Sequence, residues 1–225
     1  MTSPRVTSPI RSIEAAAVAG LVFAILDIIA LVLLNSAPDP SAPDSEIAAW
    51  YSVPSNRMSL TVGLLLSVIS AVSFLWFVAV IRRRVGDRED RFFATVFLGS
   101  GILLTGVMLV GAAALASPAV TVDLADGHVP DAGVLNAMAG LGTALLLLVL
   151  LRIQAVFVVS TSTLALLSKA FSRWLSYLGY GIALAMFFLP ILSEPVSLAF
   201  PIWVAILSVA LLIRRDDIIP EGEPA

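Results

Sequence analysis

Long apolar runs alternate with short polar joints along almost the whole of this 225-residue chain. A helix needs about 20 predominantly apolar residues to cross the hydrocarbon core of a bilayer. Six runs come close to that length or exceed it: residues 13–34, 58–81, 92–116, 134–160, 174–192 and 196–213. The pattern therefore predicts an all-α integral membrane protein, a six-helix bundle in which each run is one membrane span.

Helix-breaking and polar residues set the boundaries of these runs. Two prolines in 35–40 end the first run, and Ser117-Pro118 is expected to end the third. The hydroxyl cluster 160–163 is expected to cap the fourth. Only 193–195 separate the fifth run from the sixth, so these two should form a tight antiparallel hairpin.

The basic residues predict how the chain is threaded. Cytoplasmic loops of membrane proteins carry an excess of Lys and Arg. With residues 1–12 and the tail 214–225 in the cytoplasm, on either side of a 13–213 transmembrane domain, that side receives eleven of the thirteen basic residues: Arg5, Arg11, Arg82, Arg83, Arg84, Arg88, Arg91, Lys169, Arg173, Arg214 and Arg215. Arg57 then lies in an outer loop and Arg152 within the fourth span. Both termini are therefore expected in the cytoplasm of a bacterium, with the bundle in its plasma membrane.

The amino-acid composition limits the kinds of reactive and metal-binding sites that the chain can contain. Hydrophobic residues make up 59% of the chain and charged residues 13%, against about a quarter charged in soluble domains. The absence of cysteine excludes disulfides, thiolate metal sites and thiol nucleophiles within the chain. The one histidine, His128, lies near three aspartates in an outer loop, but the spacing matches no known metal loop. We expect a solvated loop there, and no metal or cofactor.

The longest outer loop, 36–57, contains a second helical signal. Residues 44–51 begin with acidic and hydroxyl side chains that can accept the free amides of a first turn. Trp50 and Tyr51 follow, and such rings settle at the headgroup level of a membrane. We interpret 44–51 as an interfacial helix that seats the bundle, with a ligand or partner contact on the outer face as the alternative.

Asp27 is the most unexpected residue of the chain. It lies thirteen residues beyond Glu14, roughly 20 Å along a helix axis, and so deep in the hydrocarbon. A carboxylate there costs about 2.5–3.5 kcal/mol on insertion scales. Ala16, Gly20 and Ala24 form a stripe of small residues at helical spacing, and Asp27 continues it, so its side chain should face the bundle interior. It either fixes helix packing or serves as a relay or substrate contact.

Arg152 is the candidate partner of Asp27, and together they form the candidate intramembrane polar site. An arginine at its depth can reach toward Asp27 or extend back to the cytoplasmic headgroups. Gln154 lies about 200° around the helix from Arg152 and is not expected to join it. Elsewhere, Ser67, Ser70 and the glycines of the spans are expected to serve helix packing.

Three segments resemble a known group of proteins. YSVPSNR at 51–57, FLWFVAVIRR at 74–83 and DREDRFFATVF at 87–97 are similar to uncharacterised multi-pass membrane proteins of actinobacteria. The resemblance implies a six-span fold over most of the chain. It implies no activity and no functional residue.

The sequence therefore indicates a location more clearly than a function. A structural, sensory or accessory membrane protein is the first interpretation, and the alternative is a small transporter or channel using Asp27, with Arg152 as a further candidate. An enzyme is a weaker third, since no catalytic motif is found. Beside the lipid bilayer, the expected partners are another membrane protein or a second copy of the chain. Nothing favours nucleic acid. A water-filled cavity reaching Asp27 would favour transport.

Overall fold

The computed structural model describes residues 9–85, 91–168, 173–188 and 194–216, and every regular element in these ranges is a helix. The chain termini, residues 86–90 of the charged loop, Lys169 and Pro190 lie outside the described residues. The elements in chain order are α1 (Pro9–Leu34), α2 (Asp44–Ser52), α3 (Pro54–Val85), α4 (Arg91–Leu124), α5 (Ala132–Thr143), the π-helical segment η2 (Ala144–Leu150), α6 (Leu151–Ser168), α7 (Arg173–Phe188), α8 (Glu194–Ser197) and α9 (Ala199–Asp216).

Four helical stretches in the described part of the chain are long and apolar enough to cross a membrane: Ala15–Leu34, Pro54–Arg82, Ala94–Leu124 and Ala132–Leu167. The last one comprises α5, η2 and α6 in one continuous rod. Large apolar side chains on these helices face outward, among them Val32, Trp76 and Ile102, as expected for lipid contact. The all-helical class predicted from the sequence is therefore confirmed, and four of its helices have the length and composition of membrane spans.

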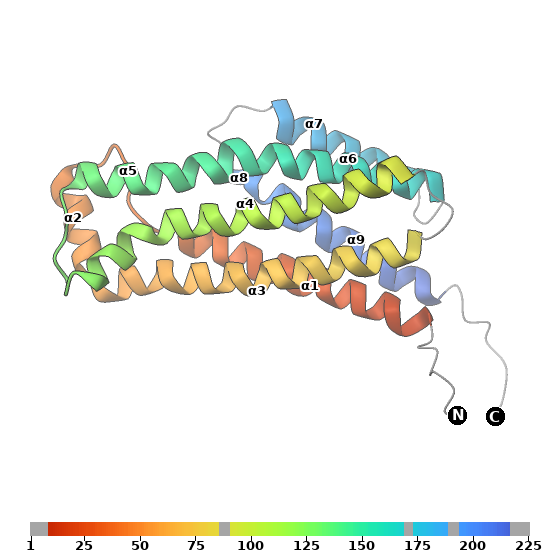
Figure 1. The fold of residues 1–225 in the computed structure, drawn as a ribbon, viewed down its shortest axis with the longest axis horizontal. Coiled ribbons are helices and arrows are strands. Elements are labelled where there is room, and N and C mark those ends of the chain that lie inside the picture. The colour runs from red at the N-terminus through yellow and green to blue at the C-terminus, as the bar shows by residue number, and fades with distance from the viewer. Residues whose placement is uncertain (1–8, 86–90, 169–172, 189–193, 217–225) are drawn as a thin grey trace, which may run out of the picture.

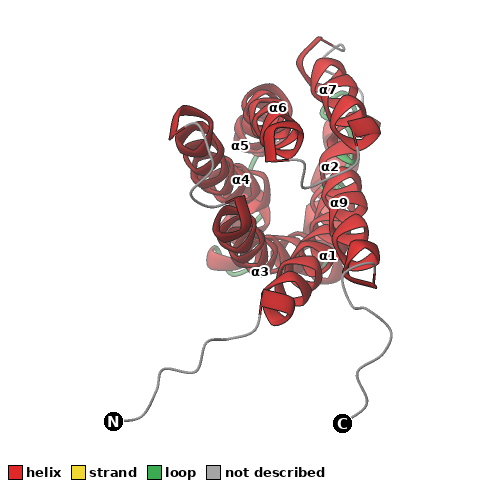
Figure 2. Ribbon diagram, turned by 90° about the vertical axis from the view of Figure 1, so that its right-hand side faces the viewer, coloured by secondary structure: helices red, strands yellow, loops and turns green. Residues whose placement is uncertain are grey.

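The long helices run side by side, and the chain folds up and down along them (Figure 1). Helix α1 packs against α3 and α9, α3 against α4, and α4 against the α5–η2–α6 rod. Helix α2 crosses one end of the bundle, which we call the α2 end; α1 begins and α9 ends at the opposite, far end. Figure 2 shows the helices nearly end-on, with α1, α3 and α4 on one side and α7 beside α6.

The last two helices differ from the expected tight hairpin. Helix α7 packs mainly on α6, and α9 packs on α1, so α7 and α9 contact each other at few of the described positions. They have 16 and 18 residues, which gives roughly 24 and 27 Å at the helical rise. Because both are short, α8 and the start of α9 lie partway along the bundle rather than at its α2 end (Figure 1).

Two predicted helix ends are wrong for one physical reason, which is that hydroxyl side chains can bond within a helix. Helix α4 continues through Pro118. That proline cannot donate to the Ala114 carbonyl four residues earlier, and the Ser117 hydroxyl donates to this carbonyl instead, at 2.7 Å. Helix α4 ends only beyond Leu124, where Asp126 and Gly127 adopt positive φ angles.

The hydroxyl cluster 160–163 likewise lies inside α6 and caps nothing. Ser160, Thr161 and Thr163 each donate to the carbonyl four residues earlier in the same helix. Such bonds satisfy a hydroxyl within an apolar helix without ending it. The Thr163 hydroxyl also lies 2.8 Å from the Tyr180 hydroxyl, which joins α6 to α7.

Aromatic rings fill the bundle interior on the far-end side of Asp27. Phe74 lies at the centre of this aromatic core, with ring centroids 4.9 Å from Phe23, 5.1 Å from Phe157 and 5.6 Å from Phe200. All four rings are completely buried. They come from α1, α3, α6 and α9, so this cluster joins helices that are far apart in the sequence.

Candidate functional site

A cavity of about 390 Å³ lies between α1, α4 and the α5–η2–α6 rod, toward the α2 end. Small side chains leave this space open, because Ala30, Ala112 and Ala139 line it from three different helices. Ser197 of α8 also lines the cavity, at the level where α7 and α9 have stopped. The short last helices and the small residues together leave this half of the bundle incompletely filled.

The inner part of the cavity carries a polar floor made of Asp27, Ser67 and Gln154. All three are buried, with Asp27 6% and Gln154 4% exposed. The Ser67 hydroxyl donates to the Gly63 carbonyl at 3.0 Å. Asp27 has no hydrogen-bond or ion-pair partner among the described residues, and neither does the Gln154 side chain, whose Oε1 is fully buried. Asp27 therefore lines the cavity as an acceptor without a donor bonded to it among the described residues, while the Gln154 amide carries an enclosed, unbonded oxygen together with an N–H₂ donor.

Helix α1 positions Asp27 as its sequence predicts. Ala16, Gly20 and Ala24 are buried along the contact with the neighbouring helices. A side chain at Gly20 would collide with the Ser208 hydroxyl and the Phe77 ring. The glycine thus permits the close approach of α1 to α3 and α9, and Asp27 continues the same stripe into the cavity.

Arg152 is not part of this site. Its guanidinium Nη1 donates to the Leu147 carbonyl at 2.7 Å, and it forms no ion pair with Asp27 in the described structure. Leu147 lies in η2, where π-helical pairing displaces backbone hydrogen bonds and leaves carbonyls to be satisfied by side chains. The candidate Asp27–Arg152 pair is therefore not formed among the described residues, and the arginine bonds to the backbone of η2 instead.

The walls of the cavity are aliphatic and its mouth is polar. Leu31, Leu146 and Leu150 are among the residues that line the middle. At the α2 end, the Asn136 amide donates to the Pro40 carbonyl at 3.2 Å, which ties the loop after α1 to α5. Asp39 lies in the same loop and is exposed; its hydrogen bonds from Ser41 hold the pKa of its carboxyl below its usual range.

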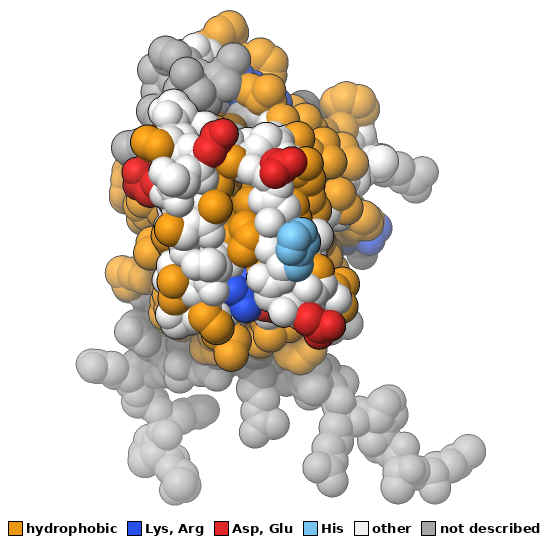
Figure 3. Space-filling view, turned by 90° about the vertical axis from the view of Figure 1, so that its left-hand side faces the viewer, with side chains coloured by type: hydrophobic (Ala, Val, Ile, Leu, Met, Phe, Trp, Pro, Cys, Tyr) orange, Lys and Arg blue, Asp and Glu red, His pale blue; other side chains and the backbone are white. Residues whose placement is uncertain are grey.

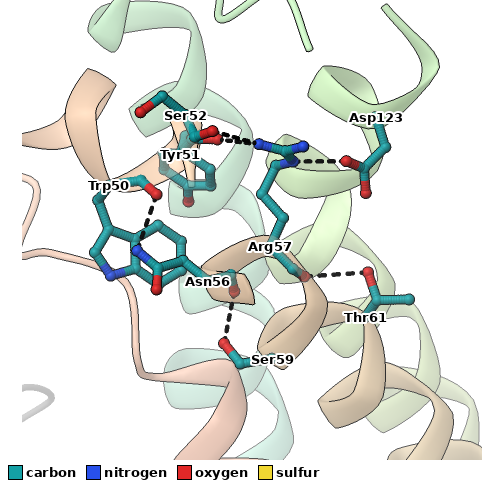
Figure 4. A network of polar contacts seen from close by, with 8 residues as sticks. All are labelled: Trp50, Tyr51, Ser52, Asn56, Arg57, Ser59, Thr61 and Asp123. Carbon is teal, nitrogen blue, oxygen red and sulfur yellow. Dashed lines mark hydrogen bonds and ion pairs between the residues drawn. The ribbon is translucent and has the colours of Figure 1, made fainter. Parts of the chain in front are cut away.

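Beside the mouth, Arg57 forms a network that joins α2, α3 and α4 (Figure 4). Its Nε lies 2.6 Å from an Asp123 carboxylate oxygen, and Nη1 donates to the Tyr51 carbonyl at 2.7 Å and to the Ser52 carbonyl at 3.1 Å. The Asn56 amide donates to the Trp50 carbonyl at 3.1 Å. Arg57 is thus a buried cation in the first turn of α3, bonded through Nε and Nη1 to α2 and α4, and not a loop residue.

The short helix predicted at 44–51 is confirmed as α2, but its packing differs from expectation. Pro43 precedes it and no side chain caps it. Tyr51 is buried against the bundle, and Ile47 and Tyr51 line the cavity. Burial raises the pKa of the Tyr51 hydroxyl to about 12, so it stays protonated at physiological pH. Helix α2 therefore covers the cavity as well as the end of the bundle.

The exposed surface of the α2 end is acidic. Figure 3 looks onto this end and shows separate acidic side chains and a histidine among hydrophobic and uncharged surface. Among the described residues, its exposed charged or imidazole side chains include Asp39, Asp44, Glu46, Asp123, Asp126, His128 and Asp131. No group of three metal-ligating side chains is found in the described ranges.

No protein family, curated protein or solved structure matches this chain. The site must therefore be interpreted from its own geometry.

Sequence reasoning located Asp27 but missed two residues that complete the picture. Gln154 lies on the opposite helix face from Arg152, and its side chain lines the cavity. Arg57 was placed in a loop, although its position three residues after Pro54, a residue typical of a first helical turn, was a usable signal.

Proposed function

We propose that this protein is a small transporter of the bacterial plasma membrane that binds its substrate at Asp27. The observation that carries the proposal is the cavity of about 390 Å³ that reaches this carboxylate inside the apolar bundle. An Asp27 that served only helix packing would be enclosed by neighbouring helices and bonded to one of them. An unpartnered carboxylate in an intramembrane cavity is instead the usual mark of a substrate or ion pathway.

The proposed threading places both termini in the cytoplasm, with the α2 end outside. The described helix ends at the far end include Arg82, Arg91, Arg173 and Arg214, while the α2 end is acidic. This asymmetry follows the preference of cytoplasmic segments for Lys and Arg. The cavity then faces the outside, and the aromatic core around Phe74 closes the path to the cytoplasm.

Six helical segments enter the membrane in this proposal, but they are not equivalent. Four are long rods, whereas α7 and α9 fall short of the roughly 30 Å thickness of a hydrocarbon core. We propose that these two enter from the cytoplasmic side and turn near the level of Ser197. Irregular backbone at membrane depth is tolerated where it lines a cavity, and Ser197 does line one.

A structural or accessory role, the first interpretation of the sequence, accounts for the helix packing but not for the cavity. Partnership with another membrane protein or a second copy of the chain is compatible with either function. The lipid-facing surface is broad and apolar, and no described feature singles out a docking face.

Cysteine labelling tests the proposal directly, because the chain has no cysteine of its own. Met108 lines the cavity from α4, and Leu104, one turn away, is buried without lining it. Met108→Cys should react with water-soluble thiol reagents, whereas Leu104→Cys should be inert. In sealed vesicles, a transporter should expose Met108→Cys to reagent from either face in turn. Labelling from the α2 side alone would indicate a receptor, and no labelling would refute the cavity as a pathway.

A further inference from the structure

The class of ligand can be inferred from the polar floor of the cavity, on the assumption that the proposed function holds. Asp27 presents acceptor oxygens to the cavity without a bonded donor among the described residues. A buried acceptor that has lost water and gained no donor is unfavourable. The missing partner must therefore supply N–H or O–H groups, and with an aspartate present it gains most if it is also positively charged.

The described residues supply no cation to this cavity. Arg152 is bonded to the Leu147 carbonyl, and Arg57 is engaged by Asp123 and the α2 carbonyls. None of the residues that line the cavity is Lys, Arg or His. An anionic ligand would meet the Asp27 carboxylate with nothing to offset it, so the electrostatics select against anions.

A bare metal ion fits this floor poorly. Calcium takes six to eight oxygen ligands and magnesium a near-ideal octahedron, whereas the floor offers one carboxylate, one amide and one hydroxyl already bonded to its own helix. The walls are also aliphatic over most of their length, from Leu31 and Leu34 to Leu146 and Leu150. Such walls solvate a hydrocarbon body and not a hydrated ion.

We infer that the cavity binds a small amphipathic ammonium ion, with Asp27 as its counter-ion and its apolar body along the leucine walls. The volume of about 390 Å³ lies at the lower end of the range of ligand pockets, about 300–1,000 Å³. A compact amine with an alkyl or aryl group is of that size. The exposed acids of the α2 end, Asp39 among them, attract such a cation toward the mouth.

The test compares four probes with the same six-carbon chain on the single-cysteine Met108→Cys protein in nanodiscs: hexylammonium, hexyltrimethylammonium, hexanol and hexanoate. Each is titrated for its ability to slow labelling by a neutral thiol reagent. Hexylammonium should protect at concentrations about tenfold or more below those of hexanol. A hydrogen bond to a charged group contributes about 1.5–3 kcal/mol, and about 1.4 kcal/mol corresponds to a tenfold change in affinity. Hexanoate should protect least. Hexyltrimethylammonium, which has the charge but no N–H, should fall between hexylammonium and hexanol.

Two substitutions assign the roles of the floor residues. Asp27→Asn should abolish the advantage of hexylammonium over hexanol while leaving protection by hexanol unchanged, which also shows that the variant is folded. Gln154→Leu removes the uncharged amide of the floor, and the advantage of hexylammonium over hexanol should persist in it, because that advantage depends on the Asp27 charge. Asp126→Asn, the same change in an exposed acid that does not line the cavity, is the matched control and should preserve the order of the probes.

The outcomes separate the two proposals. Equal protection by all four probes, or an ammonium preference that survives in Asp27→Asn, would overturn the ammonium inference and leave the cavity as a binding site. A Met108→Cys protein as inert as Leu104→Cys would overturn the proposed function together with the inference.

Discussion

Two buried polar groups near the same end of the bundle have opposite surroundings. Arg57 donates to two backbone carbonyls and pairs with Asp123, so its charge is satisfied by the fold itself. Asp27 is equally buried and meets no donor among the described residues. A polar group that the fold satisfies stabilises the structure, whereas one that it leaves unsatisfied makes a site for something else. Substitutions at these two positions can therefore test whether Arg57 contributes to stability and Asp27 to function.

Removing Arg57 should have the largest effect on stability. Arg57→Met keeps much of the apolar stem but leaves the Tyr51 and Ser52 carbonyls without their donor. Hydrogen bonds to a charged group contribute about 1.5–3 kcal/mol, so we expect the free energy of unfolding in mixed micelles to fall by about 3 kcal/mol. The ion pair itself contributes less, since the Asp123 side chain is 49% exposed.

Asp123→Asn is the control that separates the contribution of the ion pair from that of the hydrogen bonds to the backbone of α2. It removes the charge of the partner but not the backbone acceptors, and an exposed pair is worth about 1 kcal/mol or less. A loss from Asp123→Asn as large as that from Arg57→Met would show that the ion pair, and not the docking of α2, determines the stability of this end.

The sequence predicted the helices and the buried carboxylate, because both follow from one-dimensional patterns. Apolar runs of span length define the rods, and the spacing of Ala16, Gly20 and Ala24 shows which face of α1 is buried. The third and fourth rods were predicted too short, since Pro118 and Ser160 were interpreted as helix ends. Their carbonyl and hydroxyl partners are local, but whether a helix continues past them depends on the packing around it.

The cavity could not be predicted from the sequence, because it is a property of lengths and contacts between helices. It exists where α7 and α9 stop short, and α9 packs on α1, which lies at the other end of the chain. The partner of Asp27 was sought among charged residues, which led to Arg152. The structure places the uncharged Gln154 in the cavity instead, and no charge pattern marks that residue.

Ser70→Ala should have the smallest effect on stability. It tests a polar group that the fold satisfies but that lies next to the unsatisfied Asp27. Ser70 lies one turn below Ser67 on α3, is completely buried, and donates to the Phe23 carbonyl of α1 at 3.2 Å. Phe23 is itself one turn below Asp27, so this bond joins the two helices immediately beneath the polar floor. Interhelical hydrogen bonds in membrane proteins are worth about 0.6 kcal/mol on average, and the free energy of unfolding should fall by that amount.

Labelling of Met108→Cys should not change in Ser70→Ala, because the Ser70–Phe23 hydrogen bond is satisfied within the fold and faces no ligand. Ser70→Ala could instead alter labelling at Met108 while Ser67→Ala does not. In that case the Ser70–Phe23 hydrogen bond would belong to the substrate pathway, and Ser70 would count among the functional polar groups rather than the structural ones.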